Sequence, residues 1–160
     1  MRYIGIFLML LSAVFIDMAF SKTQANMLSE CSEFIMFLRH IRVRMLHSAA
    51  PVCECALGFY SKRLYSLGFI LAIQNNDEPT DAFLKIRDKL SLSKKMRELL
   101  DGFFTDLGSF GLDEEIKKLD ACIASLGLMY DEAKQKGAKD NRLMRTSLYA
   151  LSLSLAIILV

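Results

Sequence analysis

The chain has 160 residues, of which 53% are hydrophobic and 24% charged, and its formal net charge is +2. This length suits one modest domain and excludes two independent hydrophobic cores. The apolar fraction excludes a disordered or collagen-like chain, and the small net charge gives no sign of a nucleic-acid-binding protein. Residues 146–160 carry no charge, and residues 1–21 carry only Arg2 and Asp17. The sequence therefore predicts a water-facing middle domain, residues 22–145, between two apolar ends.

The N-terminal segment, residues 1–21, is predicted to be a transmembrane anchor. Its apolar run has about the 20 residues that a helix needs to cross a bilayer. A cleaved signal peptide is the alternative, but residues 18–21, Met-Ala-Phe-Ser, match a small-residue cleavage site poorly. In a retained anchor, Asp17 would lie near the membrane interface, where a carboxylate is tolerated.

The first part of the middle domain shows helical periodicity. Apolar residues at steps of three and four predict one face of a long helix: Cys31, Phe34, Ile35, Leu38, Ile41 and Met45. Ser48 and Pro51 mark the end of this helix and the start of a second helical stretch. We expect that second stretch to run to about Gln74, with Gly58 and Gly68 as candidate bends.

The clearest loop in the chain is residues 75–79, Asn-Asn-Asp-Glu-Pro. After it, Thr80 is expected to cap a short helix that continues to about Leu90. Asp81 would lie in the first turn of that helix, where a negative charge is favourable.

The last two helices of the domain have wide apolar faces. Ser93 is expected to cap the first helix, which should end at Gly108 or Gly111. Its apolar stripe comprises Met96, Leu99, Leu100, Phe103, Phe104 and Leu107. The second opens with acidic residues 113–115 and carries a seam of Ile116, Leu119, Ile123, Leu126, Tyr130 and Ala133. We therefore predict an all-α fold, an antiparallel bundle of about six helices flanked by an N-terminal and a C-terminal transmembrane helix.

The C-terminal segment, residues 146–160, is predicted to be the second anchor. As a helix it spans about 22 Å, which is short of the roughly 30 Å hydrocarbon core unless flanking cations reach toward the headgroups. A buried C-terminal helix of the domain is the alternative, but residues 156–160 are apolar all round. We expect Lys139, Arg142 and Arg145 to lie at the membrane interface.

Basic residues indicate which side of the membrane holds the domain. The domain side of the anchors carries Lys22, Lys134, Lys136, Lys139, Arg142 and Arg145, whereas the other side carries only Arg2. Since basic residues accumulate on the cytoplasmic side of membrane proteins, we expect the middle domain to be cytoplasmic. The same cluster could contact anionic headgroups, although ending a helix at the interface is its commoner role.

The sequence contains no recognised catalytic motif. It has no GxxxxGK[ST] phosphate loop, no GxGxxG after a strand and no GxSxG nucleophile elbow. Cys53 and Cys55, near His47, do not have the spacing of a structural zinc pair, and Cys31 and Cys122 supply no second pair. We expect four reduced cysteines that act as small core residues, no metal, no cofactor and no enzymatic activity.

Two segments resemble motifs of a known family. Residues 50–55, Ala-Pro-Val-Cys-Glu-Cys, are similar to a Thr-Pro-Leu-x-Glu-Ala motif, and residues 104–108, Phe-Thr-Asp-Leu-Gly, to a Leu-Gly segment. Asp17 falls where members often have an acidic residue. With the order of anchor, helical domain and apolar tail, the chain resembles, over nearly its whole length, the stage III sporulation protein AB family of endospore-forming bacteria. Gly111 and Glu115 depart from it, since members commonly have Asp and Gln after the Leu-Gly segment.

The resemblance implies a non-enzymatic component of the channel complex between mother cell and forespore, needed for forespore development. The family's cytoplasmic domain is similar to the platform proteins of type II secretion and pilus systems, which couple a cytoplasmic ATPase to a membrane assembly. The implied partners are the other stage III proteins, including the secretion-type ATPase, and the mother-cell membrane around the forespore. No nucleic acid or small-molecule substrate is expected. The main alternative is a secreted helical interaction protein with a cleaved signal peptide and a buried C-terminal helix. A membrane enzyme is disfavoured, because the sequence has no nucleophile–base pair or metal-ligand set.

A partner surface is expected at the loop of residues 75–79 and the turn that follows it. This loop is the most exposed break in the predicted bundle and should face away from both anchors. We therefore expect Asp77, Glu78, Asp81 and Phe83 to contact the ATPase, because binding surfaces combine an apolar centre with a polar rim.

Overall fold

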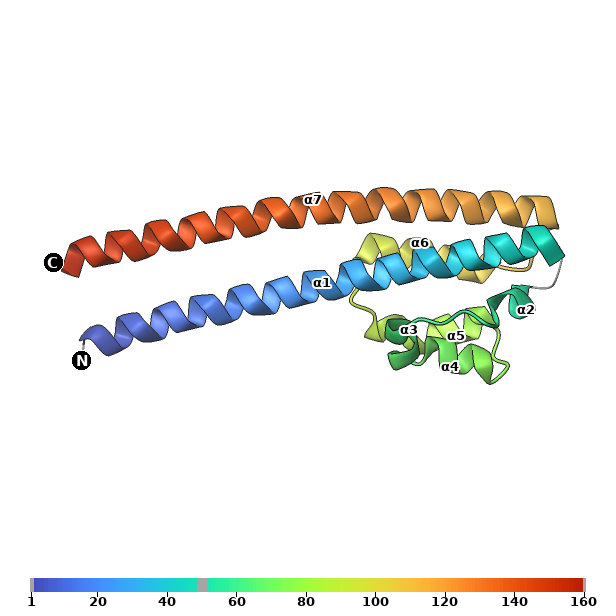
Figure 1. Cartoon of the computed structure of the whole chain (residues 1–160), viewed down its shortest axis with the longest axis horizontal. Coiled ribbons are helices and arrows are strands. Elements are labelled where there is room, and N and C mark those ends of the chain that lie inside the picture. The colour runs from blue at the N-terminus through green and yellow to red at the C-terminus, as the bar shows by residue number, and fades with distance from the viewer. Residues whose placement is uncertain (1, 49–51, 160) are drawn as a thin grey trace.

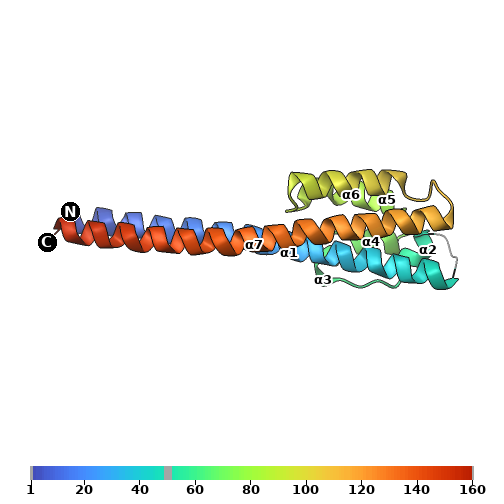
Figure 2. The same cartoon turned by 90° about the horizontal axis from the view of Figure 1, so that it is seen from above.

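The computed structural model describes residues 2–48 and 52–159, with side chains for 18–19, 21–48, 52–140, 143 and 146–147. Across these ranges all regular structure is helical, so the all-α prediction is confirmed. Two long helices, α1 (Arg2–Ser48) and α7 (Leu112–Leu159), run side by side in opposite directions (Figures 1 and 2). The shorter elements are α2 (Val52–Ala56), α3 (Lys62–Ser66), α4 (Phe69–Gln74), α5 (Pro79–Ile86), the 3₁₀ turn η1 (Arg87–Lys89) and α6 (Lys94–Asp106).

The short helices cover only the parts of α1 and α7 that lie away from the termini (Figure 1). There α1 lies between α7 on one side and α2 to α5 on the other, so that it is packed on two sides. The outer parts of α1 and α7 continue beyond this domain as a pair, and both chain ends lie at the same end of the molecule (Figures 1 and 2).

The expected borders between anchors and domain do not coincide with helix ends. Helix α1 continues without a break through residues 21 and 22, and α7 through residues 145 and 146. The predicted anchors are therefore the outer parts of the helices that also build the domain. Within the residues that the structure describes, no helix has a stretch long and apolar enough to cross a membrane.

The core is aromatic at its centre. Phe34 of α1, Phe69 of α4, Phe83 of α5 and Phe104 of α6 are all buried to 1% exposure or less. The Phe34 and Phe69 rings meet edge to face at 5.5 Å, and the Phe83 and Phe104 rings stack at 4.5 Å. Such ring pairs add to the stability that burial alone supplies. One cluster of rings thus joins α1 to three helices that follow it in the chain.

The apolar faces predicted for the long helix and for α6 are confirmed. All six residues singled out on α1 are buried: Cys31, Phe34, Ile35, Leu38, Ile41 and Met45. On α6 the buried residues are Met96, Leu100, Phe103 and Phe104, with Leu99 and Leu107 partly buried. On α7 the seam is buried at Leu119 and Leu126 and partly buried at its other positions, and Cys122 joins it.

The single helix expected up to Gln74 is wrong, because the structure has three short helices there. Gly58 and Gly68 have φ values of +84° and +93°, a left-handed conformation that favours glycine and ends a right-handed helix. The two candidate bends are therefore complete breaks between α2, α3 and α4.

The cap expected for the next helix is also wrong. Helix α5 begins at Pro79, with Glu78 as its N-cap, and it ends at Ile86. Proline suits the first helical position because its missing N–H has no partner within a helix anyway. The Thr80 hydroxyl instead donates to the Phe104 carbonyl at 2.7 Å and so ties α5 to α6. The expected cap of α6 is confirmed, since Ser93 accepts from the Met96 N–H.

Candidate partner-binding site

The predicted partner residues do not all lie on one surface. Phe83 is 0% exposed and belongs to the aromatic core, so its placement on a partner surface is wrong. Asp77 is half-buried and forms an ion pair with Lys85 at 2.5 Å. Glu78 and Asp81 are exposed, and no ion pair to either is seen among the described residues. The predicted site is thus reduced to two free acidic groups beside a paired one.

The predicted membrane-interface residues are described only in part. Lys139 is exposed on α7. The side chains of Asp17, Arg142 and Arg145 lie outside the described residues, although the backbone is helical at all three positions.

Glu78 lines a cavity of about 510 Å³, which we call the distal pocket. Its lining includes the apolar residues Met45, Val52, Phe110 and Leu112 and the acidic residues Glu78 and Glu115. These residues come from the end of α1, the start of α2, the α4–α5 loop, the α6–α7 turn and the first turn of α7. The distal pocket therefore lies at the end of the domain remote from the chain ends (Figure 1).

Glu115 has a role that the sequence did not reveal. It is only 2% exposed, and its Oε1 accepts from the N–H groups of Gly108 at 2.8 Å and Phe110 at 3.3 Å. These bonds fix the turn between α6 and α7. Its other oxygen, Oε2, is buried and has no hydrogen-bond partner among the described residues. The available signal was an acid in the first turn of a helix after a glycine-containing turn, since such acids reach back to unpaired N–H groups.

Two cations near the distal pocket, Lys85 and Lys118, already form ion pairs. Lys85 is paired with Asp77, as described above. Lys118 is paired with Asp106 at 3.2 Å, and its Nζ lies 3.2 Å from the centre of the Phe110 ring. Glu78 and Glu115 therefore line a pocket whose described lining carries no cation.

The cysteines only partly match the expected role as core residues. Cys31, Cys55 and Cys122 are buried, but Cys53 is exposed at the distal pocket, so the expectation is wrong for Cys53. Burial raises the pKa of Cys31 to about 11. Burial, followed by the nearby Cys31, raises the pKa of Cys122 to about 12. Burial also raises the pKa of the Cys53 thiol, with the negative charge of Glu78 as the next cause. Among the side chains that the structure describes, no three His, Cys, Asp or Glu residues are placed to hold a metal ion.

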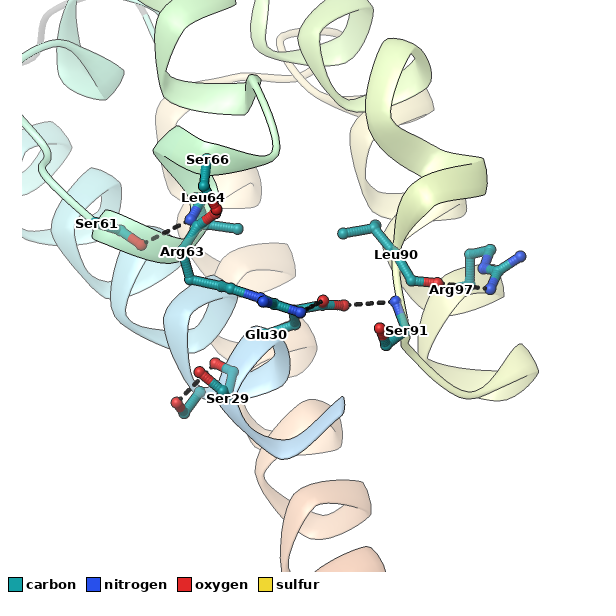
Figure 3. Close-up of polar contacts among 10 residues, drawn as sticks. Ser29, Glu30, Ser61, Arg63, Leu64, Ser66, Leu90, Ser91 and Arg97 are labelled. Carbon is teal, nitrogen blue, oxygen red and sulfur yellow. Dashed lines mark hydrogen bonds and ion pairs between the residues drawn. The ribbon is translucent and has the colours of Figure 1, made fainter. Parts of the chain in front are cut away.

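A second buried acid, Glu30, forms a polar cluster inside the domain (Figure 3). Glu30 is 0% exposed; its Oε1 accepts from Arg63 at 2.7 Å and its Oε2 from the Ser91 N–H at 2.6 Å. Arg97 donates to the carbonyls on either side of Ser91, those of Leu90 and Leu92. Both Glu30 oxygens are thus engaged in holding α1 to α3 and to the segment before α6. Because Glu30 is 0% exposed, this arrangement stabilises the domain from inside.

Comparison with known proteins addresses the identity of the chain. The family model of stage III sporulation protein AB matches residues 2–160. No match is found among curated proteins or among solved structures. Because the family model covers all but the first residue, the resemblance carried by residues 50–55 and 104–108 is confirmed. The chain belongs to the stage III sporulation protein AB family and is, by that membership, a sporulation-related protein.

Proposed function

We propose that the chain is a non-enzymatic membrane component of the channel complex between mother cell and forespore. In this role it couples the secretion-type ATPase of the complex to the membrane assembly and is needed for forespore development. The family match over residues 2–160 carries the proposal. The resemblance to that family implies a helical cytoplasmic domain similar to those of platform proteins.

Attachment to the mother-cell membrane through both ends is supported by the course of the two long helices. The ends of α1 and α7 lie together, as two anchors in one bilayer require (Figures 1 and 2). Both stay helical through the apolar segments 2–21 and 146–159. A helix satisfies its own backbone hydrogen bonds, which lipid cannot do. Lys22, Lys134, Lys136 and Lys139 are exposed on the domain side of these segments, which favours a cytoplasmic domain.

The distal pocket supports a partner role. It lies at the end of the domain farthest from the proposed anchors, where a cytoplasmic protein can approach it. It combines apolar walls with the exposed acid Glu78 and the buried acid Glu115, and protein interfaces typically have an apolar centre within a polar rim. We therefore propose that the ATPase contacts the distal pocket together with Glu78 and Asp81, and not the loop of residues 75–79 alone.

The test is capture of the ATPase by the full-length chain, purified together with it in detergent. The double charge reversal Glu78→Lys and Asp81→Lys should weaken capture without changing the helical signal. A matched control reverses Asp131 and Glu132, two exposed acids on α7 at the other end of the domain, and should capture as the parent does. Failure of the parent chain to capture the ATPase would contradict the coupling role.

The membrane and the secreted alternatives differ in the mass of the mature chain. A membrane component keeps residues 1–21, whereas a secreted protein with a cleaved signal peptide loses them. Intact mass spectrometry of the chain from sporulating cells should therefore find residues 1–21 retained.

A further inference from the structure

A carboxylate oxygen in the wall of the distal pocket has an unused hydrogen-bonding capacity. Glu115 lines the pocket and is 2% exposed, and its Oε2 has no partner among the described residues. Buried carboxylate oxygens without partners are rare, because removing an anionic oxygen from water is unfavourable unless a donor replaces the water. The site therefore calls for a donor that the described part of the chain does not supply. Because Oε2 has almost no accessible surface, a donor reaches it only by displacing part of the pocket wall.

The rest of the residue is held firmly. Two backbone N–H groups, those of Gly108 and Phe110, bind Oε1 and fix the orientation of the carboxylate. Lys118, three residues after Glu115 on α7, is directed to Asp106 and to the Phe110 ring instead. A rigidly held acceptor with an unused oxygen suits recognition, since little conformational freedom is lost when a donor binds.

We propose that the distal pocket receives the side chain of an arginine or lysine from a protein partner, with the Glu115 and Glu78 carboxylates as its acceptors. The negative charge of both groups complements the cation. The apolar walls at Met45 and Val52 suit the methylene stem, which basic residues bury while their charged ends remain paired.

The mouth of the pocket adds a second element of recognition. Phe110 is 40% and Leu112 42% exposed, and both border the cavity. We expect an apolar side chain next to the inserted cation to pack on these two residues. The partner segment is therefore a basic residue beside an apolar one. The identity of the partner as the ATPase rests on the proposed function, whereas the binding of a basic side chain in the pocket does not.

The direct test needs no partner protein. The full-length chain in detergent micelles, with methionine labelled by ¹³C at its methyl group, is titrated with arginine amide and, separately, with citrulline amide, its uncharged isostere. Met45 lines the pocket and reports binding, whereas Met36, exposed on the outer face of α1, serves as an internal control. We expect a saturable shift of the Met45 signal with arginine amide, a much weaker response to citrulline amide and no shift of Met36.

The matched variants are Glu115→Gln and Glu114→Gln. The amide introduced by Glu115→Gln keeps an oxygen for the Gly108 and Phe110 N–H groups but removes the charge. We expect this variant to weaken arginine amide binding about fivefold, since bonds to charged acceptors are the stronger ones. Glu114 is the exposed neighbour, and its change should have no effect. Should Glu115→Gln alter the spectrum of the free chain, Glu78→Gln tests the pocket through an exposed acid. An unmoved Met45 signal, or binding by both Glu115→Gln and Glu78→Gln equal to that of the parent, would overturn the proposal.

The partner is tested by placing a photo-reactive phenylalanine analogue at Phe110 in the complex with the ATPase. The cross-linked peptide should contain a basic residue beside an apolar one, and replacing that basic residue with Met should not add to the effect of Glu115→Gln. Capture of the ATPase with no effect of Glu115→Gln would overturn the pocket and leave the proposed function standing. Arginine amide binding without capture of the ATPase would support the pocket as a binding site and contradict the proposed function.

Discussion

Gly137 of α7 leaves the space that the Gln24 side chain of α1 occupies. A Cβ at position 137 would clash with the Gln24 Nε2, which donates to the Ala133 carbonyl at 3.1 Å. The absence of a side chain at one helix thus permits a hydrogen bond from the other. This bond lies near the point where the paired helices leave the domain, and it helps to set their register.

We predict that Gly137→Ala and Gly127→Ala differ in their effect on stability. Alanine is favoured over glycine within a helix by about 0.5–1 kcal/mol. At Gly127 a Cβ meets nothing within 4 Å, so the change should raise the free energy of unfolding by about that amount. At Gly137 the new methyl group displaces the Gln24 side chain. Loss of the Gln24 hydrogen bond should cost about 1 kcal/mol and so cancel the stabilisation from the higher helix propensity of alanine.

The background Gln24→Ala separates the two effects at Gly137. With the hydrogen bond already removed, Gly137→Ala should stabilise the chain as Gly127→Ala does. Urea unfolding followed by circular dichroism measures all four variants. If Gly137→Ala has the same effect in both backgrounds, Gln24 does not limit the residue at position 137.

Arg63→Met should destabilise the domain by about 2–4 kcal/mol, because it leaves the buried Glu30 carboxylate without its cation. The double variant Glu30→Gln, Arg63→Met should be more stable than Arg63→Met alone, since a neutral amide can still accept from the Ser91 N–H. As a control, Lys94→Met removes an exposed pair with Glu98 and should change the free energy by less than about 0.5 kcal/mol. A double variant no more stable than the single one would contradict this account.

The buried thiols predict a loss of stability at alkaline pH. Because the pKa of Cys122 rises from 9.0 to about 12 on folding, the unfolded chain releases this proton first as the pH rises. The stabilisation is therefore complete below pH 9 and is lost between pH 9 and about 12. Between pH 8 and 10 the parent should lose about 1 kcal/mol more than Cys122→Ala does. Urea unfolding at the two pH values measures this difference, and parallel losses would refute it.

A single cysteine at Asn75 tests the orientation of the domain. Asn75 is exposed in the α4–α5 loop. In a variant in which the four native cysteines are replaced by alanine, Asn75→Cys should resist a membrane-impermeant maleimide in intact cells and react after lysis. Labelling in intact cells would place the domain on the outer side of the membrane.

The periodic part of the fold could be predicted from the sequence. Steps of three and four residues identified the buried faces of α1 and α6, because these helices are long enough for the pattern to repeat. The helices α2, α3 and α4 have five or six residues each. Helices that short are unstable alone and form only where tertiary packing supports them. Their existence could not be read from local pattern, although Gly58 and Gly68 marked where they end.

The buried acids could not be predicted for a related reason. Glu30 stands next to Cys31 in an ordinary helical sequence, and its partners Arg63 and Ser91 lie 33 and 61 residues away. Glu115 was expected only to open a helix, since its contacts with Gly108 and Phe110 depend on the shape of one turn. Glu30 is buried by contacts with residues far along the chain, and Glu115 is buried by the shape of the turn before it. The residue type alone would place both acids on the surface.

The continuity of α1 and α7 has a mechanical consequence. Neither helix contains proline, the commonest cause of a sharp kink. The aromatic core packs against α1 at Phe34, and the end of the helix at Arg2 lies about 48 Å away at 1.5 Å per residue. A tilt of the core by about 10° would therefore displace that end by about 8 Å if the helix stays straight. The domain and its two long helices form a lever without a joint, which turns a small rotation at one end into a larger lateral movement at the other.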